Sequence, residues 1–185
     1  MRWEHLFADL EYQLAELEQA QDRSELADAE RVAVGAVRLV ERLAGSVGSP
    51  IRIGLSSGGA ASGVLIRAGV DWLLVNESHG VDLMVSHAAV NFVEGLRAAT
   101  GAAPSGIATK LDFRRALRAV ARDRSPVTVS LGGGGEIAGT LDRVGADFIE
   151  VAVHAPWESR RSAAVQSVVT VPLAAVEVVR ARPLG

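Results

Sequence analysis

Large apolar residues occupy every second position in two stretches of the chain. These residues are Ile51, Ile53 and Leu55 in the first stretch, and Val127, Val129 and Leu131 in the second. A period of two is typical of β-strands, because successive side chains of a strand point to opposite faces of the sheet. Each stretch ends in a glycine-rich segment, at 56–59 and at 132–135, where glycine supplies the positive φ of a tight turn. The pattern predicts two β-rich regions that each open with a hairpin.

The two regions are copies of one another. When the sequence is shifted by 76 residues, 49–75 aligns without a gap on 125–151, with eleven identities in 27 positions. After a ten-residue insertion in the second copy, 85–93 aligns on 171–179. The order of the matches is kept through several turns, so the chain contains an internal repeat.

Each copy carries the signals of five short strands. The strands after the first hairpin are expected through Leu65, at 72–75, 81–85 and 91–93, and through Leu141, at 148–153, 167–171 and 177–179. One helical turn is expected before each fifth strand, at 87–89 and 172–175. Five short strands with a turn before the last predict a small barrel, which leaves few unpaired edges. The expected fold class is therefore α+β, mainly β, with two tandem five-stranded barrels.

Helical segments are expected to precede both barrels. The segment 24–43 has small apolar residues on one face, with Ser24 as N-cap and Gly45 as terminator, and a second helix is expected at 110–124. The predicted organisation is an N-terminal helical segment (1–45), a first barrel (46–94), a linker (95–109), and a helix with the second barrel (110–181).

The arrangement resembles the SH3-like small barrels, and in particular the Sm-like (LSm) family. The likeness rests on V-x-V-x-L-x-G from Val127, then G-x-L at 139–141, then Asp147, and then two strands joined by one turn. It covers 126–180 well and 50–93 less well. The resemblance implies RNA contact, but two family features are absent: the Asn that follows the family's Asp, and the Arg-Gly pair near strand four. The likeness therefore implies the fold without the uridine pocket.

The N-terminus has the pattern of an amphipathic helix. Apolar residues recur at alternating steps of four and three: Trp3, Phe7, Leu10, Leu14 and Leu17. Two interpretations stay open. The helix packs on its own barrel or on a second helix, or it associates with another copy or a partner protein.

Composition narrows the classes of protein. Hydrophobic residues make up 49% and charged residues 22%, as in soluble globular proteins, and the low aromatic content of 4% argues against a base-stacking platform. The absence of cysteine excludes disulfides, thiolate metal sites and cysteine nucleophiles. With no secretory signal and no long apolar run, we expect a cytoplasmic protein that does not contact a membrane.

Charge is distributed unevenly around a net value of −3. Residues 1–30 contain nine acidic and two basic residues, whereas 110–124 contains six basic and two acidic residues. Arg114, Arg118 and Arg122 recur at steps of four and predict a cationic stripe on a helix. This stripe either contacts the phosphates of a nucleic acid or pairs with the acidic N-terminal segment.

The inserted segment of the second copy, 154–163, is the best candidate for a partner site. It contains Trp157, Arg160 and Arg161, and Trp and Arg are frequent in binding hot spots. An ordinary loop whose Trp folds back on the barrel explains the same residues equally well.

No segment matches a catalytic motif. The glycine run at 132–135 lacks the Gly-Lys-Ser/Thr of a phosphate loop, the four histidines share no metal-ligand spacing, and Asp71 and Asp147 occupy equivalent turns that favour backbone capping. We therefore expect no catalytic residue, metal, cofactor or small-molecule substrate. The sequence favours a non-enzymatic, oligomeric and regulatory binding or adaptor protein with a protein partner. The alternative is an RNA- or DNA-binding regulator that uses the arginine stripe and the 154–163 loop.

Overall fold

The computed structural model describes residues 34–77, 80–154 and 167–181, with isolated positions between 12 and 32. The chain divides into two units, residues 1–38 and residues 39–185. Described positions of the first unit are helical from Tyr12 to Ala36, and Val37 and Arg38 are not helical. The apolar residues of the predicted N-terminal helix lie outside the described residues; they are Trp3, Phe7, Leu10, Leu14 and Leu17.

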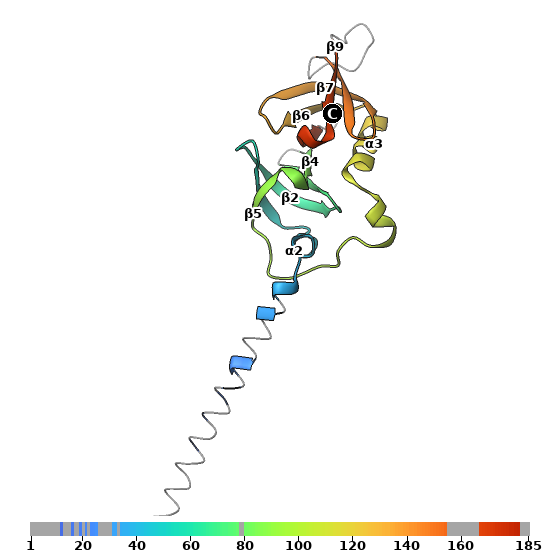
Figure 1. The fold of residues 1–185 in the computed structure, drawn as a ribbon. Helices are drawn as coiled ribbons and strands as arrows, with labels where there is room; N and C mark the ends of the chain where they lie inside the picture. The colour runs from blue at the N-terminus through green and yellow to red at the C-terminus, as the bar shows by residue number, and fades with distance from the viewer. Residues whose placement is uncertain are drawn as a thin grey trace, which may run out of the picture. The chain divides into compact units, whose positions relative to one another are not determined.

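The second unit is built mainly from strands (Figure 1). The strands of the first copy are β1 (Pro50–Leu55), β2 (Ala60–Ala68), β3 (Trp72–Glu77), β4 (Val81–Ser86) and β5 (Val90–Glu94). Those of the second copy are β6 (Pro126–Leu131), β7 (Glu136–Val144), β8 (Phe148–Val153), β9 (Ser167–Pro172) and β10 (Val176–Ala181). The helical elements are α2 (Leu39–Gly45), η2 (His87–Ala89), η3 (Gly106–Lys110), α3 (Phe113–Asp123) and η4 (Leu173–Ala175).

All ten strands belong to one open antiparallel sheet. Their order is β5-β1-β2-β3-β4-β10-β6-β7-β8-β9. The prediction of two separate five-stranded barrels is therefore wrong, because β4 of the first copy pairs with β10 of the second. Each copy alone would leave an apolar edge strand unpaired, and joining β4 to β10 satisfies the backbone groups of both edges. We call this β4–β10 pairing the seam.

The internal repeat is visible in the backbone. The strand order of the first copy, β5-β1-β2-β3-β4, is repeated by β10-β6-β7-β8-β9. Hydrogen bonds at the hairpins match as well: the N–H groups of Leu55 and Leu131 donate to the carbonyl oxygens of Gly59 and Gly135, at 2.9 and 3.1 Å. The two copies thus share one design, although they do not form separate barrels.

Each copy has its own hydrophobic cluster, and near the seam each cluster includes residues of the other copy. Val178 on β10 lies in the cluster of the first copy, whereas Trp72 and Met84 of the first copy lie in the cluster of the second. The alternating residues of β1 are buried as predicted, and so are Val127 and Val129. Since each half contributes to the other's core, the residues from 39 onward form one compact unit.

The connection between the copies is held in place. The N–H of Gly101 donates to the carbonyl oxygen of Glu41 at 2.8 Å, and an added Cβ at Gly45 would lie 2.3 Å from the carbonyl oxygen of Ala99. The helix predicted at 110–124 is present as α3, which begins after the N-cap Asp112 and ends at Arg124 with a φ of 60°. In addition, the side chain of Asp71 accepts a hydrogen bond from the N–H of Phe113 at 2.7 Å.

Candidate functional site

A buried carboxylate lies at the seam. Glu177 on β10 is only 2% exposed, and it accepts hydrogen bonds from the hairpin between β1 and β2. The donors are the hydroxyl of Ser56 at 2.5 Å, the hydroxyl of Ser57 at 2.6 Å and the N–H of Ser57 at 2.8 Å. Burial raises the pKa of Glu177, but these hydrogen bonds outweigh burial and hold the pKa below its ordinary value. The group is therefore an ionised acceptor that ties the two copies together.

The repeat does not preserve this cluster. Asn91 stands where the second copy has Glu177, and glycines 132 and 133 stand where the first copy has its two serines. Asn91 instead donates from its side-chain amide to the carbonyl oxygen of Leu55 at 3.1 Å. Sequence reasoning missed the cluster, because it treated the serines as turn residues and Glu177 as an ordinary strand residue. The mismatch between the two copies is the signal that points to it.

The two outer strands of the sheet, β5 and β9, are the equivalents of the two strands at the seam. Shifting the sequence by 86 residues aligns β5 on β10 and β4 on β9. Among the described residues, no strand pairs with the outer edge of β5 or of β9. The side chain equivalent to Val178 is Phe92, which is 45% exposed, whereas Val178 is 3% exposed. Val178 has β4 beside it, whereas no described strand lies beside β5 on the outer side of Phe92.

The outer strand β9 has an uncharged edge that no described strand covers. Its sequence, SVVTVP, contains no charged residue, and Val168 is 54% exposed. Natural edge strands are commonly protected by charges, bulges or a covering segment. An uncharged strand rich in β-branched residues is suited to pairing with another strand.

The predicted arginine stripe is engaged largely with its own chain. Arg118 donates to the carbonyl oxygens of Val144 and Gly145 at 3.3 to 3.4 Å. Arg114 lies 3.6 Å from Asp112, which it contacts as an ion pair. The Arg118 contacts join α3 to the end of β7, so part of the stripe has a structural role (Figure 1).

Four arginines nevertheless gather around one recess of about 420 Å³. Its polar lining consists of Arg118, Arg122, Arg124, Arg143 and Asp142. Arg124 pairs with Asp142 at 3.1 Å, and Arg143 pairs with Glu150 at 3.6 Å. Positive charge therefore exceeds negative charge at this surface, and sequence spacing alone identified only Arg118 and Arg122.

The remaining predicted site residues are not brought into view. Trp157, Arg160 and Arg161 lie outside the described residues. Within the described ranges, no group of three or more His, Asp or Glu side chains is arranged to hold a metal ion. No helix in the described part of the chain is long and apolar enough to span a membrane.

Comparisons with known proteins leave the chain unassigned. No family model, no curated protein and no solved structure matches it. The resemblance to the Sm-like family therefore stays a prediction.

Proposed function

We propose that this protein is a non-enzymatic adaptor, and that several chains join head to tail through the outer strands of their sheets. The observation that carries the proposal is the equivalence of β5 and β9 to β10 and β4, the two strands that pair at the seam. A contact of the same kind between chains would bury Phe92 as the seam buries Val178. It would also cover the uncharged edge of β9.

The repeat predicts the register of this contact. At the seam, Val178 pairs with Val85, and Arg180 pairs with Leu83. Replacing β10 by its equivalent β5, and β4 by its equivalent β9, gives the expected pairs between two chains. Phe92 of one chain pairs with Val171 of the next chain, and Glu94 pairs with Val169. Because the two surfaces differ, the contact is heterologous, and each chain offers β5 to one neighbour and β9 to the other. Such an assembly displays many identical binding surfaces, which suits an adaptor.

Cysteine cross-linking tests the register directly, because the natural sequence contains no cysteine. Residues directly opposite in antiparallel strands have Cβ atoms about 5 Å apart, close to the separation that a disulfide spans. We expect the double variant Glu94→Cys/Val169→Cys to form a ladder of disulfide-linked chains on non-reducing gels after mild oxidation.

The matched control moves one cysteine by a single position. In Glu94→Cys/Val168→Cys the two side chains point to opposite faces of the predicted joined sheet, so cross-linking should be weak. Equal ladders from both double variants, or no ladder from a folded Glu94→Cys/Val169→Cys protein, would contradict the proposal. Circular dichroism establishes that each variant is folded.

The recess of four arginines supports a second candidate function, the binding of RNA or DNA by its phosphates. We expect a labelled single strand to bind with salt-sensitive affinity, and Arg122→Ala/Arg143→Ala to weaken binding more than Arg67→Ala. Arg67 is the equivalent of Arg143 in the first copy and lies outside the recess. Fluorescence anisotropy at about 50 and 200 mM salt measures the effect. Binding that ignores salt, or equal losses in both variants, would contradict this function.

A further inference from the structure

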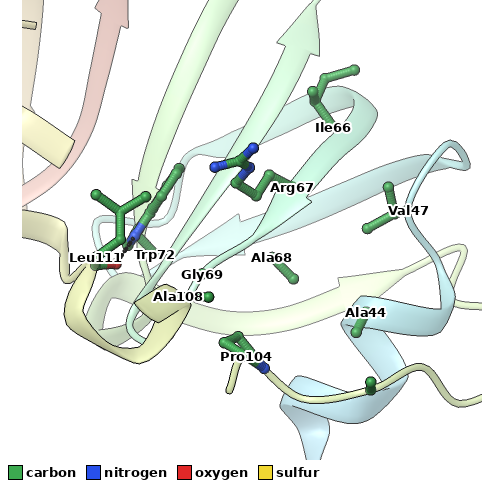
Figure 2. Close-up of a pocket in the computed structure, with 11 residues that line it drawn as sticks. Ala44, Val47, Ile66, Arg67, Ala68, Gly69, Trp72, Pro104, Ala108 and Leu111 are labelled. Carbon is green, nitrogen blue, oxygen red and sulfur yellow. Dashed lines mark hydrogen bonds between the residues drawn. The ribbon is translucent and has the colours of Figure 1, made fainter. Parts of the chain in front are cut away.

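A largely apolar pocket of about 540 Å³ lies beside β2 in the first copy (Figure 2). Trp72 and Leu111 lie at one end of it, and Ala44 and Val47 lie at the other. The remaining lining residues are Ile66, Arg67, Ala68, Gly69, Ala102, Pro104 and Ala108. Its volume falls within the range of small-molecule sites, which are concave and mostly apolar with a few polar groups.

The apolar lining is accessible to solvent. Val47 is 42% exposed and Ile66 is 46% exposed. The indole N–H of Trp72 donates to the carbonyl oxygen of Leu111 at 2.8 Å, and Trp72 is only 4% exposed, so the accessible apolar surface of the pocket comes mainly from Val47 and Ile66. An added Cβ on Gly69 would lie 2.4 Å from the Trp72 ring, so this glycine allows the ring to pack against the strand. A ligand with an apolar body would therefore remove aliphatic surface from water.

The repeat allows this pocket to be compared with the equivalent surface of the second copy. The equivalent of 66–68 in the second copy is 142–144, and this segment is bordered by Ala121 and Arg122 from the last turn of α3. Helix α3 has 11 residues, whereas α2, which packs on β2, has only 7. Both copies have a recess at this position, and the two recesses differ in their lining, which is largely apolar beside α2 and rich in arginine beside α3.

A single positive charge lies at this pocket. Arg67 is the only ionisable residue in the lining, and it forms no ion pair with any described residue. Its equivalent, Arg143, pairs with Glu150 on the neighbouring strand. Leu74 occupies the position of Glu150 in the first copy and lies opposite Arg67. Because a leucine stands where the second copy has Glu150, Arg67 has no carboxylate opposite it on the neighbouring strand and is available to the anionic group of a ligand.

We infer that this pocket binds a small amphipathic carboxylate, with its apolar body against Val47 and Ile66 and its carboxylate on Arg67. A guanidinium offers a carboxylate two parallel N–H donors, which makes such pairs strong and directional. One arginine balances one negative charge, so the pocket favours a monoanion. The inference goes beyond the proposed adaptor function, because none of these residues lies on β5 or β9.

The test uses decanoate, with decanol and decylamine as neutral and cationic ligands of equal chain length. Isothermal titration calorimetry should detect decanoate most strongly. The indole N–H resonance of Trp72 should shift in a saturable way during the same titration. Arg67→Met should weaken decanoate binding about tenfold and leave decanol binding nearly unchanged, since only the carboxylate contact is lost.

Arg143→Met is the matched control, because it removes the equivalent arginine of the second copy. It should leave decanoate binding unchanged. A second variant, Ala108→Phe, partly fills the pocket and should abolish binding of both decanoate and decanol. The inference is overturned if decanoate does not bind saturably, if decanol binds as tightly as decanoate, or if both Met variants lose equal affinity. The cross-linking ladder of the outer strands reports on the adaptor function independently of these outcomes.

Discussion

Glu177 connects residues that are far apart in the sequence. Its carboxylate is buried, and it accepts hydrogen bonds from two serines about 120 positions earlier in the chain. A buried carboxylate loses much of its hydration, so its stability depends on the donors that replace water. Here the two hydroxyls and one backbone N–H supply those donors.

We predict that Glu177→Gln lowers the free energy of unfolding by about 2 kcal/mol at neutral pH, because an amide both loses the charge and presents donors to donors. Urea unfolding measures the loss. Glu136→Gln is the control, since the side chain of Glu136 is 57% exposed and its ion pair with Arg180 contributes little.

The same prediction has a defined pH dependence. The pKa of Glu177 in the folded protein is lowered, so its contribution is present above the ordinary pKa of 4.5 and is lost as pH falls through the lowered value. The difference in unfolding free energy between the natural protein and Glu177→Gln should therefore shrink in acid. A difference that is constant from neutral to strongly acidic pH would contradict this account.

At the scale of elements, equivalent turns of the two copies have diverged in use. Asp71 and Asp147 occupy matching positions before β3 and β8, and both carbonyl oxygens accept a backbone hydrogen bond, from His87 and Leu173. Only the Asp71 side chain also accepts from the first turn of α3, at Phe113. One turn therefore holds the helix of the other copy in place.

We predict that Asp71→Ala lowers the free energy of unfolding by about 1 kcal/mol, because an N–H of the first turn of α3 loses its acceptor. Asp147→Ala should have a much smaller effect, since no hydrogen bond links its side chain to a described helix. Thermal unfolding monitored by circular dichroism compares the two variants. Equal losses would show that Asp71 acts only within its own turn.

Local patterns predicted the strands and α3, but the helix predicted at 24–43 is interrupted at Val37 and Arg38. The strands follow from alternating residues such as Ile51 and Ile53, and α3 follows from its helical period. Asp71 was predicted to cap the backbone of its own turn, but its side chain accepts a hydrogen bond from Phe113 instead, which was missed because an Asp in a turn contains no information about a helix 42 positions away. The pocket beside β2 was missed for a related reason: its lining comes from segments that are far apart in the sequence, such as those of Val47, Ile66 and Leu111.

At the scale of the whole molecule, the seam was the main feature that the sequence did not predict. Periodicity indicates which residues face a core, but it does not state which edge of a sheet meets which other edge. Closing each copy on itself and joining β4 to β10 satisfy the same hydrophobic pattern. The structure adopts the second arrangement, with Val178 of one copy buried among the side chains of the other.

Because each chain contains two linked repeats, the number of repeats in a closed assembly is restricted. Every chain brings its two copies already joined in one orientation, so any closed ring built through β5 and β9 contains an even number of repeats. Rings with an odd number of repeats are inaccessible to this chain. In such a ring, the junction within each chain would have the serines and Glu177, whereas the junction between chains would have glycines and Asn91 in their places. The junctions between chains would then be the weaker ones, so dissociation would release whole chains.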